Sequence, residues 1–442
     1  MSGVRTTPLE EWAAKRIGAG KAGITREQLA RHQLLRLRAT IGWALETSPF
    51  YRSRLAGCAA AEIACPGDLG RLPFTTADDV RRWGPRFLCV SQSDVSRVVT
   101  LDSSGTTGQA KRFYFTPADQ EGTVDFFQYG MASLTDKGDR VLILLPGERP
   151  GGVGDLLAAA LRRLGVRPVP HGMVVSIPDT LAVMAAEKID TLVGIPSQVL
   201  ALARWADSNG PAVSVKSILL STDHVPRAIV RELERVWGCE VFEHYGMTEL
   251  GLGGGTDCAA HAGYHLHEAD FYFEVVDPES GAPVPEGGEG EVVVTTLTRR
   301  GMPLIRYRTG DISRMIPGRC PCGSVLRRLA PVARRRDGLI SLGGYGGFSL
   351  ADLDEALFAV PGLIGFTAAV DRFSHAARLT IAASLLPGAA GKHGSGLAAV
   401  LDAVPAIRLA RQAGALSVAA AVETCRGRLE AGAAKRAIVE LS

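Results

Sequence analysis

A turn rich in hydroxyl and glycine residues is the first place in this 442-residue chain where chemistry is expected. The segment SSGTTGQAK (103–111) lies between two short apolar runs of strand composition. Because glycine lacks a Cβ, the backbone approaches a phosphate closely, and successive N–H groups and hydroxyls surround its oxygens while Lys111 adds positive charge. A flexible polar hairpin turn explains the same composition equally well. A Walker A loop is excluded, since no GK[ST] follows.

The elements that must position this turn follow an alternation. After residue 98, short apolar runs alternate with segments of helical periodicity, which favours mostly parallel α/β layers. We expect strands at 140–146, 165–170, 191–196 and 214–221, and helices at 155–164, 178–188 and 226–237. Residues 116–117 mark a further helix start. Nearer the N-terminus, apolar spacing predicts helix over 8–57, with 48–49 ending that stretch and 75–76 capping a later helix.

The pattern changes beyond about residue 270. Runs at 271–278, 291–297 and 303–311 indicate antiparallel strands joined by turns at 277–281 and 285–290. The polar, Gly-rich segment 334–347 predicts a domain boundary. We therefore predict an α/β fold with a large N-terminal domain (1–336) of α/β layers plus an antiparallel β subdomain. A small mobile α+β C-terminal domain (337–442) follows, with helices at 350–360 and 397–404 and a strand at 379–386.

Three motifs, in order, resemble the adenylate-forming superfamily, which contains acyl-CoA synthetases, luciferases and peptide-synthetase adenylation domains. SSGTTGQAK is similar to its phosphate loop, HYGMTE (244–249) to its YGxTE motif, and YRTGD (307–311) to its YxTGD motif. The segments SPFYRSRL, LPFTTADDVR, EVVDPESG, GGEGEV and CPCG resemble the phenylacetate–CoA ligase branch. The likeness runs from about residue 30 to the C-terminus and weakens in 145–200 and after 365.

The resemblance implies an enzyme that uses ATP and Mg²⁺ to activate a carboxylic acid, by family default an aromatic one, as acyl-AMP and then transfers the acyl group to CoA. Glu249 would hold Mg²⁺, and Thr248 would contact the α-phosphate. Tyr245 and Gly246 would lie at the adenine, and Asp311 would accept both ribose hydroxyls. The polyphosphate would be held by Ser103, Ser104, Gly105, Thr106, Thr107, Gly108 and Lys111. Without the motifs, Glu249 is equally explained as an exposed charge, Tyr245 as a buried tyrosine and Asp311 as a residue of a turn.

Other correspondences with the family are less complete. Asp223 falls in a segment that lines the adenine pocket, and Arg335 matches the Arg of a GRxxD junction whose Gly is replaced here. Asp337 would then be the hinge of the small domain, beside the mobile Gly-rich segment 343–347. Residues 195–197 are candidates for the acyl pocket.

The family's C-terminal catalytic Lys has no ungapped counterpart. That position is Ala433, and Lys435 replaces the missing Lys only with a local shift. A solvated charge on the tail is the alternative for Lys435. Without a bridging Lys, acyl-AMP formation should be slow, and the enzyme would rely on a partner or a preformed intermediate.

Four residues from two segments form a candidate structural zinc site. Cys258, His265, Cys320 and Cys322 supply three thiolates and one imidazole, a sound Zn²⁺ set. Their spacing, C-x₆-H and C-x-C, is not the usual pair of CxxC motifs, but some members of the branch look similar here. Buried free thiols with a surface His remain the alternative. Four protein ligands would leave no open position, so such a zinc would be structural.

Composition limits the other functions. Hydrophobic residues are 46%, charged residues 21% and net charge +3, which fits a soluble globular protein and argues against a general nucleic-acid surface. We find neither a membrane-spanning run nor a signal peptide, and expect a cytoplasmic protein whose eight cysteines are free thiols or metal ligands. Partners left open are a second copy of the chain or a carrier protein. Transfer to an amine or a carrier-protein thiol, and a degenerate nucleotide-binding relative, are the alternative functions.

Overall fold

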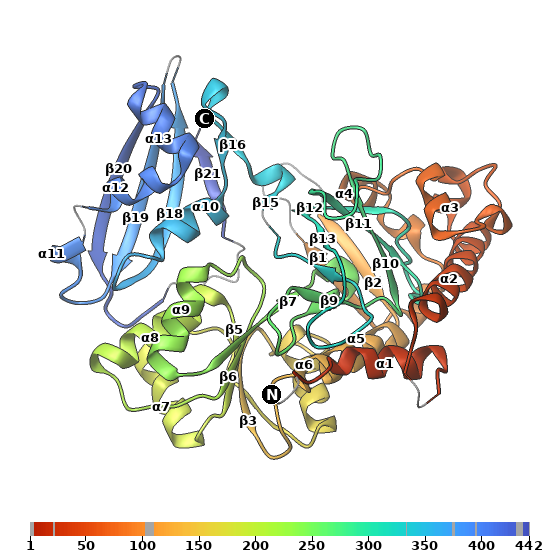
Figure 1. Cartoon of the computed structure of the whole chain (residues 1–442), viewed down its shortest axis with the longest axis horizontal. Helices are drawn as coiled ribbons and strands as arrows, with labels where there is room; N and C mark the ends of the chain where they lie inside the picture. The colour runs from red at the N-terminus through yellow and green to blue at the C-terminus, as the bar shows by residue number, and fades with distance from the viewer. Residues whose placement is uncertain are drawn as a thin grey trace. The chain divides into compact units, whose positions relative to one another are not determined.

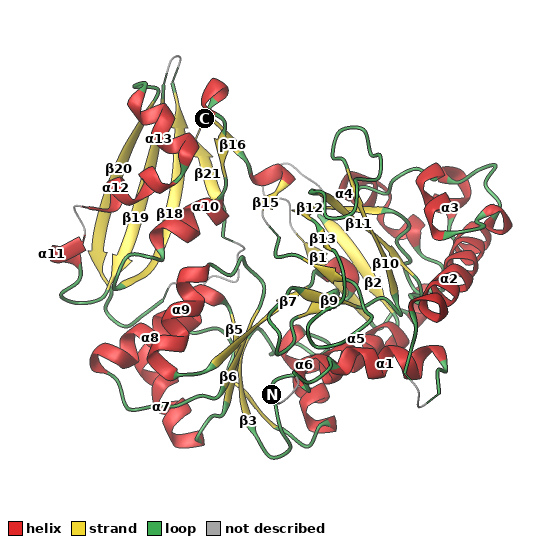
Figure 2. Cartoon of the chain, viewed as in Figure 1, coloured by secondary structure: helices red, strands yellow, loops and turns green. Residues whose placement is uncertain are grey.

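The chain folds into two compact units, shown in the computed structural model of Figure 1. The structure describes residues 4–20, 23–101, 110–332, 334–373, 376–393, 396–429 and 436–441. The first unit comprises Met1–Leu134, Ala159–Leu164 and His244–Val332, and the second comprises Thr135–Ala158, Gly165–Glu243 and Ala333–Ser442. Both units combine helices and strands (Figure 2), so the predicted α/β class is confirmed.

A parallel sheet forms the centre of the second unit's N-terminal part. The strands pair in the order β4–β3–β5–β6–β7. They are β3 (Arg140–Leu144), β4 (Arg167–Pro170), β5 (Thr191–Gly194), β6 (Ser217–Leu220) and β7 (Glu240–Tyr245), alternating with α6 (Val153–Arg163), α7 (Ile177–Glu187), α8 (Pro196–Asn209) and α9 (Arg227–Trp237). Every residue of β5 and β6 is buried, as a parallel sheet covered on both faces requires. The predicted alternation of strands and helices is confirmed.

The rest of the second unit is built on a mixed sheet. Its order is β20–β19–β18–β21, with β18 and β19 antiparallel and the outer pairs parallel. The elements are β15 (Arg334–Arg335), β16 (Ile340–Ser341), β17 (Gly347–Phe348), α10 (Leu350–Leu357), β18 (Leu363–Arg372), β19 (Ala377–Leu385), α11 (Ala390–His393), α12 (Leu397–Val400), α13 (Pro405–Gln412), β20 (Leu416–Thr424) and β21 (Ile438–Leu441). Elements α10, β19 and α12 match the sequence expectation, whereas β18, β20, β21 and α13 were missed.

One apolar core serves both parts of the second unit. Buried Leu200 of α8 belongs to the same cluster as Leu353 of α10 and Leu363 of β18. The guanidinium of Arg204, also on α8, donates to the carbonyls of Leu363 and Phe358. Residues on both sides of the expected domain boundary at 336/337 pack in this one core. The boundary therefore stays a prediction.

The helices of the first unit depart from the sequence expectation at the N-terminus. They are α1 (Pro8–Ile17), α2 (Arg26–Thr47), α3 (Pro49–Arg54), α4 (Ala77–Trp83) and α5 (Pro117–Met131). A continuous helix over 8–57 is wrong: Gly18 ends α1 with φ 71°, and Thr25 starts α2 with a capping box to Gln28. The predicted starts are confirmed where Thr76 caps α4 and Thr116 caps α5.

Short sheets complete the first unit. Strands β1 (Arg97–Leu101) and β2 (Lys111–Phe115) form an antiparallel hairpin. The predicted antiparallel region is confirmed in the ladder of β10 (Phe271–Val276), β11 (Gly290–Thr296) and β12 (Tyr307–Ser313). The last two residues of β7 pair with β8 (Gly255–Thr256), and β9 (Tyr264–Leu266), β14 (Arg328–Leu329) and β13 (Met315–Ile316) continue that sheet.

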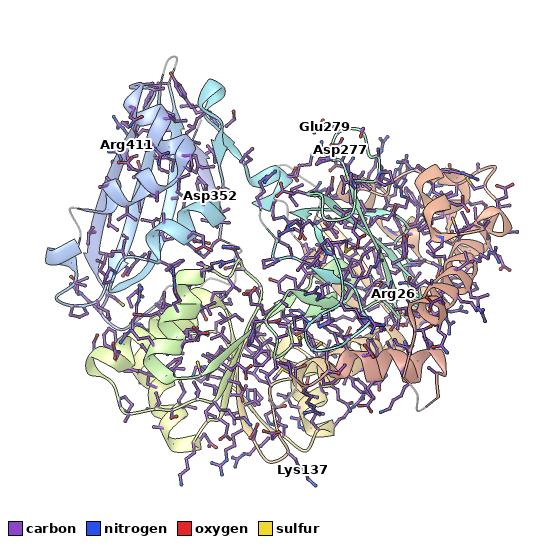
Figure 3. All side chains as sticks on the ribbon, viewed as in Figure 1. Arg26, Lys137, Asp277, Glu279, Asp352 and Arg411 are labelled. Atoms are coloured by element: carbon purple, nitrogen blue, oxygen red, sulfur yellow. The ribbon has the colours of Figure 1, made fainter. Side chains whose placement is uncertain are left out.

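A buried carboxylate ties the N-terminal helices to this β region. Glu268 is 1% exposed and lies 2.6 Å from the guanidinium of Arg26 and 2.9 Å from that of Arg327. Figure 3 labels Arg26 on α2. Two cations around one buried anion satisfy its charge and most of its lone pairs.

Within the described part of the chain, no helix has both the length and the apolar composition needed to cross a bilayer.

Candidate functional site

The β1–β2 hairpin frames the predicted phosphate loop. Leu101 pairs with Lys111, so the intervening chain leaves and re-enters at one end of the hairpin. The predicted residues Ser103, Ser104, Gly105, Thr106, Thr107 and Gly108 lie outside the described residues. Lys111, the first residue of β2, is described and largely buried.

Glu249 is the centre of a charged cluster in the first unit. It lies in a short 3₁₀ turn, η5 (Thr248–Leu250), separated from the end of β7 by two residues, and is 6% exposed. The ammonium of Lys111 lies 2.8 Å from Glu249 Oε1, and the hydroxyl of Tyr307 donates to the same oxygen at 3.3 Å. The structure thus brings together a residue from each of the three motifs. Thr248 is half-buried beside Glu249.

Tyr245 and Asp311 form a second polar pair in the same unit. The Tyr245 hydroxyl donates to Asp311 Oδ2 at 3.1 Å, and both side chains are 6% exposed. The ring of Tyr245 stacks on that of Tyr264, with centroids 6.1 Å apart. At Gly246 a Cβ would lie 2.4 Å from the Leu252 carbonyl oxygen, so only glycine fits there. The roles predicted at the adenine and ribose stay predictions.

The remaining predicted site residues are Asp223, Arg335 and Lys435. Asp223 follows β6 and is half-buried in the second unit, where Arg335 is exposed in β15. Lys435 lies outside the described residues. Sequence reasoning missed Tyr307 as a partner of Glu249, although Tyr307 is the first residue of the YRTGD motif.

The four candidate zinc ligands converge in the first unit. Cys258, His265, Cys320 and Cys322 are all buried, and their ligand atoms lie within 4.8 Å of one another. Cys258 Sγ is 3.8 Å from Cys320 Sγ, and Cys322 Sγ is 3.4 Å from His265 Nε2. The 3.8 Å separation is far longer than a disulfide bond, which is about 2.05 Å. The residues come from β9, the segment after β8 and the loop between β13 and β14.

Burial sets the protonation state of this Cys/His cluster. Burial raises the pKa of the Cys258 and Cys320 thiols, and burial lowers the pKa of His265 to about 4. Without a cation, burial therefore keeps these thiols protonated and the imidazole neutral. A neutral imidazole and thiols that lose their protons to a metal are the forms that bind Zn²⁺.

The fold is that of an adenylate-forming CoA ligase, and residues 97–298 match the family model described as AMP-binding enzyme. The chain is 31% identical over 354 residues to a phenylacetate-coenzyme A ligase of Thermus thermophilus, covering 77% of this chain and 78% of that protein. It is 29% identical over 381 residues to the ligase of Aromatoleum evansii, covering 84% of each. The chain belongs to the phenylacetate–CoA ligase family of adenylate-forming ligases.

A solved structure supports the fold. A 2-hydroxyisobutyryl-CoA ligase in the postadenylation state with 2-HIB-AMP has a TM-score of 0.78, with 20% identity over 94% of this chain and 90% of that one. The same ligase with 2-HIB-AMP and CoA in the thioesterification state has a TM-score of 0.66. The likeness extends over nearly the whole chain.

Proposed function

We propose that this protein activates a carboxylic acid with ATP and passes the acyl group to CoA. A carboxylate oxygen attacks the α-phosphorus, forming acyl-AMP as pyrophosphate leaves. The thiol sulfur of CoA then attacks the acyl carbon, AMP leaves, and the thiol proton is released. The observation that carries this proposal is the buried cluster of Lys111, Glu249 and Tyr307, which unites three separated motifs in a member of this family.

In this proposal, different residues bind different parts of the nucleotide. Glu249 is a buried carboxylate, a fitting oxygen ligand for Mg²⁺, which would neutralise phosphate charge. Lys111 holds the Glu249 carboxylate in place, and Thr248 lies beside it to meet the α-phosphate. Asp311 takes the ribose hydroxyls, and its bond from Tyr245 orients it. The loop at 103–108 supplies the remaining contacts to the phosphates.

The names of the relatives suggest the class of acid. Relatives are named for phenylacetate, so an aryl acid is the first candidate, and residues 195–197 are proposed for its pocket. Purified protein is given ATP, Mg²⁺ and a panel of aryl and aliphatic acids, and pyrophosphate release is followed. CoA is then added and the thioester is sought by mass spectrometry. Absence of ATP and AMP affinity in a folded preparation would end the proposal.

The acceptor and the C-terminal Lys are tested with the same assay. Pyrophosphate release without a CoA thioester would point to an amine or a carrier-protein thiol. We propose that Lys435 bridges the acid and the α-phosphate, so Lys435→Ala should slow adenylation while Lys137→Ala, an exposed control labelled in Figure 3, should not. Asp337 is proposed as the hinge around which 337–442 moves between the two half-reactions, and Arg335 is proposed as a nucleotide-binding residue beside it. Use of ATP and CoA suits a cytoplasmic enzyme.

We also propose that Cys258, His265, Cys320 and Cys322 hold a structural Zn²⁺. Two sulfurs bound to one tetrahedral zinc lie about 3.8 Å apart, and a sulfur and a nitrogen about 3.6 Å. The separations of 3.8 Å and 3.4 Å fit that geometry. Metal analysis after gentle purification should give about one zinc per chain, and thiol titration before and after chelation should expose three additional cysteines. A metal-free, fully folded protein would contradict the assignment.

A further inference from the structure

Arg299 is a buried cation beside the charged cluster. It is 8% exposed and lies in the segment between β11 and β12. Its Nη1 donates to the backbone carbonyl of Glu249, and its guanidinium lies over the ring of Phe115, 4.9 Å from the centroid. One side chain therefore contacts both the last residue of β2, which leads out of the phosphate loop, and the main chain of the residue predicted to hold Mg²⁺.

The segment that carries Arg299 is itself fixed. The backbone N–H groups of Arg300 and Gly301 donate to the carboxylate of Asp119 at 3.1 Å and 3.3 Å. Asp119 also accepts from the N–H of Thr116 in the capping box that starts α5. Because α5 follows β2 after a single residue, Asp119 anchors the base of Arg299 to the hairpin that presents the loop.

The turn that receives the guanidinium is tightly packed. A Cβ at Gly251 would lie 2.9 Å from Arg299 Nη2, and Gly251 has φ +66°. The hydroxyl of Thr123 donates to the Gly251 carbonyl at 2.7 Å. Arg299 also lines a cavity of about 260 Å³ together with Asp119 and Asp270. Burial lowers the pKa of Arg299, while Asp119 and Glu249 oppose that shift.

We propose that Arg299 is a positioning residue that holds the Glu249 backbone in register with the phosphate-loop hairpin, so that the carboxylate meets the metal-bound polyphosphate. The inference rests on the proposed function, in which Glu249 is the Mg²⁺ ligand. A carbonyl held by a charged donor is fixed more firmly than by a neutral one. A merely structural arginine would affect every form of the nucleotide equally, whereas a positioning residue acts where the metal is present.

The test compares nucleotide binding with and without metal, which needs no knowledge of the acid. Arg299→Met removes the charge and the fork at similar length. We expect calorimetry to show about tenfold weaker ATP binding in saturating Mg²⁺, the loss of one charge-assisted hydrogen bond. ATP binding in EDTA should change less than about twofold, since loop and ribose contacts persist. Arg299→Lys, which keeps the charge, should recover part of the metal-dependent binding.

Arg38→Met is the matched control, because Arg38 also donates to one backbone carbonyl, that of Ile63, away from the cluster. It should bind as the wild type does. Equal losses with and without Mg²⁺, or unchanged Mg²⁺–ATP affinity, would overturn the proposal. If the Met variant does not fold, Arg299→Gln decides, with at least about threefold weaker metal-dependent binding expected. Failure of the proposed function looks different, because the wild type itself would then bind no ATP.

Discussion

The charged cluster around Glu249 and the Cys/His cluster at Cys258 share the first unit but are built on opposite principles. Glu249 receives the ammonium of Lys111 and the hydroxyl of Tyr307 on one oxygen, an arrangement of exchangeable polar contacts. The Cys/His cluster closes four buried ligands on one point. In the proposed function, the first would hold a metal that arrives and leaves with the nucleotide, and the second a metal that stays. Variants that change one cluster should leave the other intact.

Glu249→Gln should have the largest effect. The amide keeps the shape but loses the charge that pairs with Lys111 and is proposed to bind Mg²⁺, so pyrophosphate release should fall on the order of a hundredfold. Zinc content should not change. Glu279→Gln, at an exposed turn labelled in Figure 3, is the control and should retain full activity. Nearly normal activity in the Glu249 variant would remove this residue from the site.

Cys322→Ser should reverse the pattern. Loss of one thiolate opens the proposed zinc site, and the free energy of unfolding should drop by at least about 2 kcal/mol, measured by urea denaturation. Metal content should fall with it, while activity per folded molecule remains. Cys65→Ser, at an exposed free cysteine, should change neither quantity. Unaltered stability in the Cys322 variant would argue that the cluster holds free thiols.

Acid should weaken the fold near the charged cluster through His244. Burial lowers the pKa of His244 to about 4, below its unfolded value of 6.5. The unfolded chain therefore binds the proton first, and stability is lost as pH falls from 6.5 toward 4, by at most about 1.4 kcal/mol per pH unit. Urea titrations of wild type and His244→Asn should differ in slope over that window. Parallel pH profiles of the wild type and His244→Asn would contradict the prediction. The variant His171→Gln serves as the control.

Tyr307→Phe should have the smallest effect. It removes one neutral donor, 3.3 Å from Glu249 Oε1, while Lys111 stays in place. Adenylation should slow about tenfold, because a long hydrogen bond to an ionised carboxylate falls at the lower end of the roughly 1.5–3 kcal/mol that such bonds contribute. A loss as large as that of Glu249→Gln would show that Tyr307 touches the substrate directly.

Local signals were predictable from the sequence, and long-range contacts were not. Thr116 with Pro117 fixed the start of α5, because a capping box and a first-turn proline are local chemistry. The four Cys and His residues were found by type, since few side chains serve as zinc ligands. The expected helix over 8–57 broke at Gly18, whose effect outweighed the apolar spacing.

The partners of Glu249 could not be read from spacing. Lys111 lies 138 positions away and Tyr307 lies 58 away, and only the packed fold brings them to one oxygen. Arg299 carries no motif, so its contact with the Glu249 carbonyl appears only in three dimensions. The strand β20 was missed because the alanine-rich segment Leu416–Thr424 has weak strand propensity on its own.

The ion pairs of Glu268 with Arg26 and Arg327 make α2 an integral part of the first unit. A shortened protein that begins after Arg26 would strand a buried anion with one guanidinium instead of two, at a cost of about 3–5 kcal/mol if the pair behaves as other buried ones do. Glu268 lies three residues from His265. Loss of the Arg26 contact would therefore also disturb the Cys/His cluster. Trimming for crystallisation should therefore stop short of α2.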